Sequence, residues 1–247
     1  MERRNLLKAV GGIAVTASAS GVGVLAMSGG AAAQSSFTIG DSSVTLDDGD
    51  VSKIGVQLSH EVSWDGFDIP VEAASYTDTI ELRDGNGNTL DSATIFDNSN
   101  NPVLLEGWSS EGSGGDGWGG AGEYTSGPGT EGSVNADLDW TVLSDDPAGD
   151  GGTETPGDID DFGIENPTDG SEEDFILRYT KTVTLFTTES NGGTAVSAAD
   201  GTTVYQLGVD DGTVGDVVGQ DNFTVTVGNQ EATTSSGTTS PGTSSAQ

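Results

Sequence analysis

The sequence alternates apolar and polar residues with a period of two over several long segments, and this pattern limits the fold more than any other feature. Because successive side chains of a β-strand point to opposite faces, each such segment is a half-buried strand. In residues 51–64 the apolar parity holds Ile54, Val56, Leu58, Val62 and Trp64. In residues 174–188 it holds Phe175, Leu177, Tyr179, Val183 and Leu185.

Further segments have the same character: residues 36–46, 76–83, 89–96, 134–142, 202–207 and 222–227. No window outside the N-terminal segment has a helical period. About eight strands with polar, glycine-rich connections predict an all-β protein, an antiparallel β-sandwich or jelly-roll. The clearest hairpin joins 76–83 to 89–96 and turns through the sequence DGNGN at residues 84–88.

Two connections are longer than loops of compact domains usually are. Residues 107–133 place Trp108, Trp118 and Tyr124 in a glycine-rich background, whereas residues 144–173 are strongly acidic and rich in turn-forming residues. The last segment, residues 231–247, consists mainly of Ser, Thr and Gly, which is typical of a flexible tail. The sequence therefore predicts one sandwich domain over residues 34–230 followed by this tail.

The chain is strongly acidic, with a formal net charge of −33. Residues 1–33 contain one acidic and three basic side chains, so the rest of the chain carries 39 acidic and 4 basic groups, a net charge of −35. Such a surface repels itself and destabilises the compact state in dilute buffer. At about 1 M salt the screening length falls to roughly 3 Å, and most of this repulsion is screened.

Three explanations of the acidity compete: an acidic disordered chain, a cation-binding protein, and adaptation to molar salt. Four tryptophans and the alternating segments argue against disorder. Acidity is spread along the whole chain and lysine occurs only at positions 8, 53 and 181, which favours adaptation to salt. No basic patch is present to neutralise phosphates, so nucleic acid is excluded as a partner.

The N-terminal residues 2–8, ERRNLLK, resemble the twin-arginine export signal, whose pattern is S/T-R-R-x-F-L-K. Four residues occupy pattern positions, Leu6 stands where Phe is usual, and Glu2 replaces the Ser or Thr; the matching residues are Arg3, Arg4, Leu7 and Lys8. A weakly apolar stretch follows at 9–33 and ends in a small-residue cleavage motif, Ala31 to Ala33. The expectation is a signal peptide over residues 1–33 and a mature N-terminus at Gln34.

An uncleaved membrane anchor is the alternative interpretation. A spanning helix needs about 20 continuous apolar residues, but glycine and serine interrupt residues 9–33. The signal and the composition together resemble proteins that haloarchaea export by the twin-arginine pathway. This resemblance implies that the export machinery is a partner and that the protein crosses the membrane already folded. It implies a secreted or cell-surface location, with membrane contact only during export or if the signal is retained.

The residue inventory excludes several kinds of chemistry. The chain has no cysteine, so disulfides, iron–sulfur clusters and cysteine nucleophiles are excluded. His60 is the only histidine and lies on the apolar parity of its strand, which predicts a structural, partly buried imidazole. One histidine makes a zinc site or a Ser–His–Asp triad a weak hypothesis. No cofactor is predicted.

The DGNGN turn partly matches a calcium loop, because Asp84, Asn86 and Asn88 occupy its first, third and fifth positions. Thr89 replaces the expected glycine and Ile95 the expected glutamate, so an ordinary hairpin explains these residues better. Asn222 begins the only glycosylation sequon. Phe223, Val225 and Val227 lie on the opposite parity of the same strand and are expected to face the core, so Asn222 is predicted to point outward.

The aromatic residues of loop 107–133 are candidates for stacking on sugars or on a partner protein, namely Trp108, Trp118 and Tyr124. The alternative is that they fold back and cover one end of the sandwich. The leading functional prediction is a non-catalytic, exported structural or assembly protein, such as a filament or surface-coat subunit. A carbohydrate- or ligand-binding module that uses this loop is the second hypothesis, and a secreted hydrolase is the third.

Overall fold

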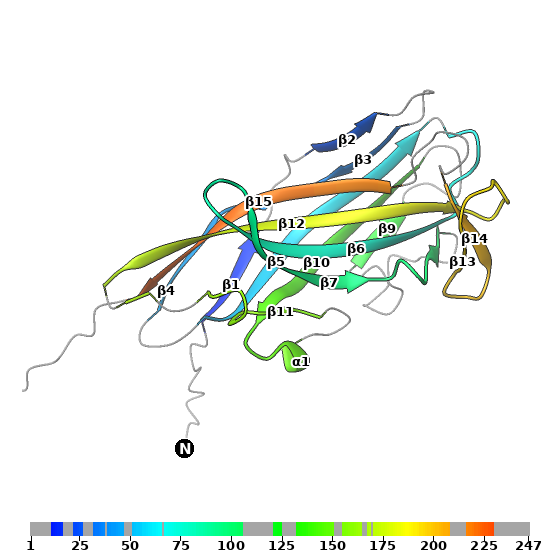
Figure 1. Ribbon diagram of the computed structural model, residues 1–247. Coiled ribbons are helices and arrows are strands. Elements are labelled where there is room, and N and C mark those ends of the chain that lie inside the picture. Colours follow the sequence, from blue (N-terminus) through cyan, green and yellow to red (C-terminus); the bar gives the residue numbers. More distant parts are fainter. Residues whose placement is uncertain are drawn as a thin grey trace, which may run out of the picture.

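Two β-sheets pack face to face and form an elongated sandwich (Figure 1). The computed structural model describes residues 11–16, 22–26, 32–37, 39–46, 51–65, 67–105, 121–124, 132–150, 155–164, 167–168, 170–207 and 216–229. The prediction of an all-β sandwich is confirmed. The described residues form fifteen strands instead of about eight, because several strands are too short to show a recognisable alternation.

The first sheet is built around the long strand β5. Strand β10 pairs with one edge of β5 over almost its whole length, and β1 and β3 share the other edge. Its seven strands are β1 (Gly11–Thr16), β2 (Val22–Ala26), β3 (Ala32–Ser36), β5 (Val51–Asp65), β9 (Ala121–Tyr124), β10 (Gly132–Ser144) and β11 (Gly157–Asp158).

The second sheet is built around β12, which lies between β6 and β15 (Figure 1). Strand β7 pairs with the outer edge of β6 and closes the predicted hairpin, which is confirmed. The eight strands are β4 (Ser42–Leu46), β6 (Ala73–Arg83), β7 (Thr89–Asp97), β8 (Val103–Leu104), β12 (Glu172–Thr187), β13 (Ala195–Ser197), β14 (Thr203–Gln206) and β15 (Asp216–Asn229).

Among the described residues both sheets are antiparallel except for three parallel strand pairs. These pairs are β1 with β5, β4 with β15, and β10 with β11. Each adds a short strand to the outer side of a long one. Alternation within one segment predicts a strand but carries no information about the direction of its neighbour.

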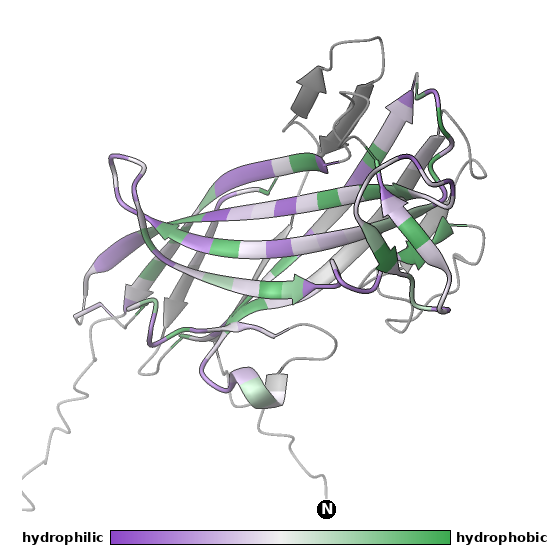
Figure 2. Ribbon diagram, turned by 45° about the vertical axis from the view of Figure 1, so that its right-hand side comes forward, coloured by the Kyte–Doolittle hydropathy of each residue, from purple (hydrophilic) through white to green (hydrophobic). Residues whose placement is uncertain are grey.

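The core lies between the two sheets and consists of the side chains that alternation assigns to the inner face. In Figure 2 hydrophobic and hydrophilic bands alternate along the long strands. Almost fully buried are Ile54, Val56 and Trp140 from the first sheet and Leu177, Val183 and Phe223 from the second. Burial of these apolar faces against each other stabilises the sandwich, since each large side chain contributes about 1.5–3 kcal/mol.

The acidic connection between β10 and β12 is anchored to the core. It contains the short helix α1 (Pro147–Asp150) and β11, and it buries the side chains of Ile159, Phe162 and Ile164. The sequence analysis treated residues 144–173 as a turn-rich acidic loop and missed these anchors. Isolated apolar residues among many carboxylates show no period, so their burial is visible only in the folded chain.

The segment that follows the predicted cleavage site is part of the sandwich of its own chain. Phe37 and Ile39 are buried, and β4 pairs with β15. Two further hydrogen bonds attach this segment to β15. The Ile39 N–H donates to Asp221 Oδ2 at 2.8 Å, and the Thr224 N–H donates to Asp41 Oδ1 at 2.7 Å.

Within the predicted export segment, residues 11–16, 22–26 and 32–33 lie in strands of the first sheet, and β3 continues to residue 36. Ala33 and Gln34, on either side of the predicted cleavage site, lie in β3. The twin-arginine residues and Ala31 lie outside the described residues, so export and cleavage stay predictions. The part of the chain that the structure describes contains no helix of the length and apolarity that a membrane span requires.

Candidate functional site: a buried lysine–aspartate pair

A lysine and an aspartate face each other inside the sandwich. Asp78 lies on β6 and Lys181 lies on β12, directly opposite each other in the antiparallel register. Both residues belong to the parity that faces the other sheet, and both side chains are 0% exposed. Charged side chains are almost never fully buried unless they are paired, so this pair is the most unusual feature of the described core.

The carboxyl group of Asp78 accepts three hydrogen bonds from β12. Lys181 Nζ lies 2.9 Å from Oδ2 and 3.1 Å from Oδ1. The Tyr179 hydroxyl donates to Oδ1 at 2.6 Å. Tyr179 and Lys181 are two residues apart and therefore project from the same face of β12. One strand thus supplies every donor to the carboxyl group, and the sheet register fixes their positions.

Aromatic rings surround the amino group of Lys181. Nζ lies 3.5 Å from the centroid of the Tyr76 ring and 5.0 Å from that of the Trp140 ring. Phe96 stacks on Tyr76 with 4.8 Å between the ring centroids. Trp140 belongs to the first sheet, so the two sheets enclose the ion pair between them. Ring faces of this kind attract a cation, and they also exclude water from it.

His60, on β5, belongs to the same group of buried side chains and contacts Phe37. The ring centroids of Phe37 and His60 are 5.7 Å apart, and the Phe37 ring also meets the Tyr179 ring edge-on at 5.6 Å. Burial holds the pKa of His60 well below its usual value, and the nearby Lys181 ammonium lowers that pKa further. The imidazole is therefore neutral at pH 7. The sequence predicted a partly buried imidazole, and the structure buries it more completely, with an exposed fraction of 2%.

Burial also shifts the pKa values of the paired groups toward their neutral forms. Loss of hydration raises the pKa of Asp78, although the Lys181 charge and the hydrogen bonds from Tyr179 and Lys181 oppose this rise. The same loss of hydration lowers the pKa of Lys181, against the attraction of Asp78. In both cases desolvation is the larger effect. The site therefore makes a neutral amine facing a neutral carboxylic acid accessible.

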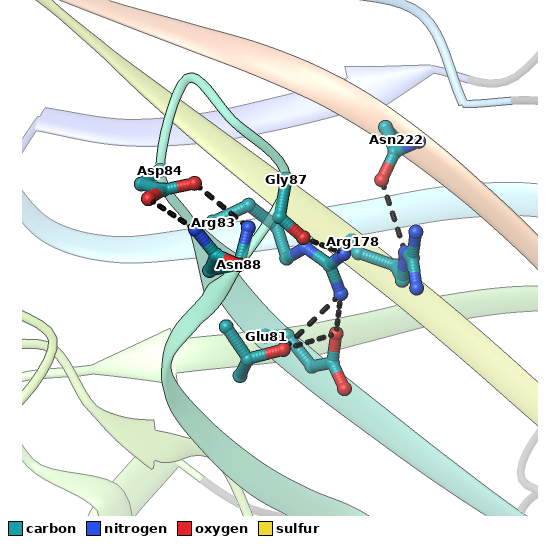
Figure 3. A network of polar contacts seen from close by, with 8 residues as sticks. Glu81, Arg83, Asp84, Gly87, Asn88, Arg178 and Asn222 are labelled. Carbon is teal, nitrogen blue, oxygen red and sulfur yellow. Dashed lines mark hydrogen bonds and ion pairs between the residues drawn. The ribbon is translucent and has the colours of Figure 1, made fainter.

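The predicted calcium-loop residues form an ordinary hairpin turn between β6 and β7 (Figure 3). The Asp84 carboxylate accepts hydrogen bonds from the backbone N–H groups of Asn86 and Asn88, at 2.9 and 2.7 Å, and from the Asn88 side chain at 2.8 Å. These bonds lower the pKa of Asp84, with the Asn88 side chain as the largest cause. Gly87 has a φ of 84°, which the turn requires. The contacts within the turn account for its sequence.

A second polar network lies beside this turn (Figure 3). Arg83 forms an ion pair with Glu81, with 2.6 Å between Nη1 and Oε2, and its other terminal nitrogen donates to the Gly87 carbonyl. Arg178 Nε donates to Asn222 Oδ1 at 3.1 Å. Asn222 is exposed on β15 while Phe223, Val225 and Val227 are buried. The predicted orientation of the sequon is confirmed.

The aromatic loop falls largely outside the described residues. Trp108 and Trp118 are outside them, and Tyr124 lies in β9 opposite Val134 of β10. Whether the three residues form one binding surface therefore stays a prediction. In the described part of the chain, no group of three or more His, Asp or Glu side chains is arranged to hold a metal ion.

Asp78 and Lys181 were not among the predicted site residues, although the sequence contains a signal for each. Asp78 interrupts the apolar parity of its strand between Tyr76 and Ile80. Lys181 interrupts the parity of β12 between Tyr179 and Val183. A charged residue on the inner parity of a strand requires a buried partner. Two such interruptions of opposite charge were sufficient to suggest a pair.

Comparisons with protein-family models, with curated proteins and with solved structures found no match to this chain.

Proposed function

We propose that this chain is an exported, non-catalytic structural subunit that associates with further copies of itself at the cell surface. The association adds a strand of one copy along the edge of β5 in another. One observation carries this proposal: most of the covered β5 edge is paired with residues of the predicted export segment, namely β1 and the first two residues of β3.

Two short strands cover this edge. Residues 51–57 of β5 pair in parallel with β1, and residues 61–65 pair antiparallel with β3. Cleavage before Gln34 would remove β1, β2 and the first two residues of β3. Most of a 15-residue strand would then present unpaired N–H and C=O groups, which readily pair with another chain.

A second copy of the chain is the natural occupant, because every processed copy exposes the same edge. Two identical β5 strands can pair antiparallel about a two-fold axis, which makes the contact self-complementary. Backbone hydrogen bonding does not depend on the side-chain charges. The net charge of −35 opposes close approach in dilute buffer, so this association requires molar salt.

In the second sheet, the outer edge of β7 is poorly suited to pairing with another chain. Strand β7 pairs with β6 through two register irregularities and exposes most of its side chains. Bulges and polar side chains of this kind discourage edge pairing. Strand β5 pairs with β10 without interruption from Trp64 to Gly55. Its edge is therefore the better surface for association.

Residues 34–46, which follow the predicted cleavage site, could also add as a strand to a neighbouring copy, but they are less suited to this than the β5 edge. Phe37 and Ile39 fill the core of their own chain, and β4 pairs with its own β15. Donation of residues 34–46 to a neighbour would require extraction of both side chains. Pairing along residues 51–57 of β5, which lose β1 on cleavage, requires no such rearrangement.

The test compares the full chain with residues 34–247 in about 2 M KCl, where charge repulsion is screened. Sedimentation at several protein concentrations should show a monomeric full chain and concentration-dependent dimers or larger species of the shortened chain. If the folded shortened chain is a monomer at all concentrations, the proposal is wrong.

Cysteine cross-linking identifies the contact, because the chain has no native cysteine. Lys53→Cys and Gln57→Cys, on the outward parity of the part of β5 that loses β1, should give disulfide-linked dimers when the two shortened variants are mixed under oxidising conditions. Ser92→Cys on β7 is the matched control and should stay monomeric. Equal cross-linking at both sites would contradict a specific β5 contact.

A further inference from the structure

We propose that Lys181 and Asp78 react with each other to form an intramolecular isopeptide bond, which joins β12 covalently to β6. The inference concerns a chemical modification inside one chain, so it does not depend on the proposed assembly.

The two groups already lie in a reactive arrangement. Lys181 Nζ is 2.9 and 3.1 Å from the two oxygens of the Asp78 carboxyl group, so it is almost equally distant from both. The carbon between these oxygens is then about 3–3.5 Å from Nζ, the separation of a near-attack geometry. The carboxyl group turns about a broad side-chain torsion, which lets the amine approach its face. Both side chains come from paired strands, and the register holds them together.

Burial supplies the protonation states that the reaction needs. An amine is a nucleophile only when it is unprotonated, and a carboxylic acid is attacked more readily than a carboxylate. Desolvation lowers the pKa of Lys181 and raises the pKa of Asp78. Transfer of one proton across the pair converts the ammonium and carboxylate into an amine and an acid. No other residue has to take up or supply that proton.

The reaction is balanced without a co-reactant. Lys181 Nζ attacks the carboxyl carbon of Asp78 and forms a tetrahedral intermediate. A carbon–oxygen bond then breaks, and the departing hydroxyl takes a proton from the nitrogen and leaves as water. One amide and one water molecule form from one amine and one acid, and nothing is oxidised or reduced.

Tyr179 acts on the reacting carboxyl group. Its hydroxyl donates a 2.6 Å hydrogen bond to Asp78 Oδ1, the oxygen on which negative charge develops when the amine attacks. A donor that is already in place stabilises this charge without reorganisation. Tyr179 is therefore a catalytic residue of the proposed reaction.

The surroundings favour the product and protect it. Amide formation replaces two buried charges with one neutral group and so removes a large desolvation cost. The rings of Tyr76, Trp140 and Phe96 around the pair keep water from hydrolysing the bond. The bond would close a loop between residues 103 positions apart. In a chain without cysteine, it would serve as a disulfide does in other secreted proteins.

Mass spectrometry of a tryptic digest of the unfolded full chain tests this proposal directly. Without the bond, cleavage after Lys53 and Arg83 releases peptide 54–83, and cleavage after Arg178 and Lys181 releases the tripeptide 179–181. With the bond, Lys181 is not cleaved, and peptide 54–83 appears joined to residues 179–247. Its mass equals the sum of the two peptides minus one water molecule. Release of the free tripeptide without any linked product would overturn the proposal, and this result does not depend on a variant that folds.

Variants separate the roles of the three residues. Lys181→Arg keeps the charge and the tryptic site but removes the nucleophile, so it should give only unlinked peptides. Asp78→Asn should link with the loss of ammonia in place of water. Tyr179→Phe should lower the linked fraction in chains digested at early times after synthesis, whereas Tyr205→Phe on β14, outside the cluster, should leave it unchanged. A linked fraction unaffected by Tyr179→Phe would remove the catalytic role of that residue.

Discussion

Phe37 offers a quantitative test of the fold, because it lies just after the predicted cleavage site and yet is only 1% exposed. Its ring meets those of Tyr179 and His60 edge-on. In Phe37→Ala the lost burial amounts to about 1.5–3 kcal/mol. The two lost aromatic contacts add roughly 0.5–1.5 kcal/mol each. The sum agrees with the approximately 3–5 kcal/mol that removal of a buried phenylalanine usually costs.

Urea unfolding in constant molar KCl, followed by tryptophan fluorescence, measures this loss, since Trp64 and Trp140 are buried. Leu90→Ala is the control. Leu90 is 63% exposed, so its replacement should change the free energy of unfolding by less than about 0.5 kcal/mol.

The measurement is repeated over a range of protein concentrations. A loss that is the same at all concentrations shows that Phe37 is buried within its own chain. A loss below about 1 kcal/mol, well short of the usual cost of a buried phenylalanine, would refute the inference that residues 37–46 belong to the sandwich. A loss that appears only at high concentration would indicate that this segment is buried in a neighbouring copy instead.

Three further predictions concern salt, pH and the β6–β7 turn. The free energy of unfolding should rise steeply between about 0.1 and 4 M KCl, as charge repulsion is screened; a flat profile would contradict adaptation to salt. Below pH 6.5 the unfolded chain protonates its histidine while buried His60 stays neutral, because its pKa is lowered. Stability should therefore fall on acidification by up to about 1.4 kcal/mol per pH unit, and His60→Leu should reduce this slope in urea titrations at pH 5–7. Gly87→Ala should cost about 1–2 kcal/mol, because its φ is 84°. Gly85→Ala, at a position with open space around it, should leave the unfolding midpoint nearly unchanged.

The long strands were predictable because each repeats its pattern many times. In β5, β6 and β12 the buried residues follow one parity with few exceptions, and the alternation needs no knowledge of the neighbours. The turn at residues 84–88 was predictable for a similar reason, since its backbone demands are local. The short strands β8, β11 and β13 were not predictable, because two or three residues define no period.

The order and direction of the strands were not predictable from alternation. Strand β4 lies parallel to β15 although about 180 residues separate them, and hydrogen-bond pairing across that distance leaves no mark on either local sequence. Residues 11–16 and 22–26 read as a weakly apolar export segment and are strands in the structure. Which of these two states applies depends on whether the predicted signal peptide is cleaved, and the fold does not determine that.

By itself, the sequence determined the fold class, the inner face of each long strand and the strongly acidic composition, from which stabilisation by salt is predicted. These properties follow from local pattern and composition. Only the tertiary structure decided that Asp78 meets Lys181. Alternation shows that each charged side chain points inward, but it does not say which strand lies opposite or in what register. The contact depends on the pairing of β6 with β12, and that pairing arises from the packing of the whole sandwich.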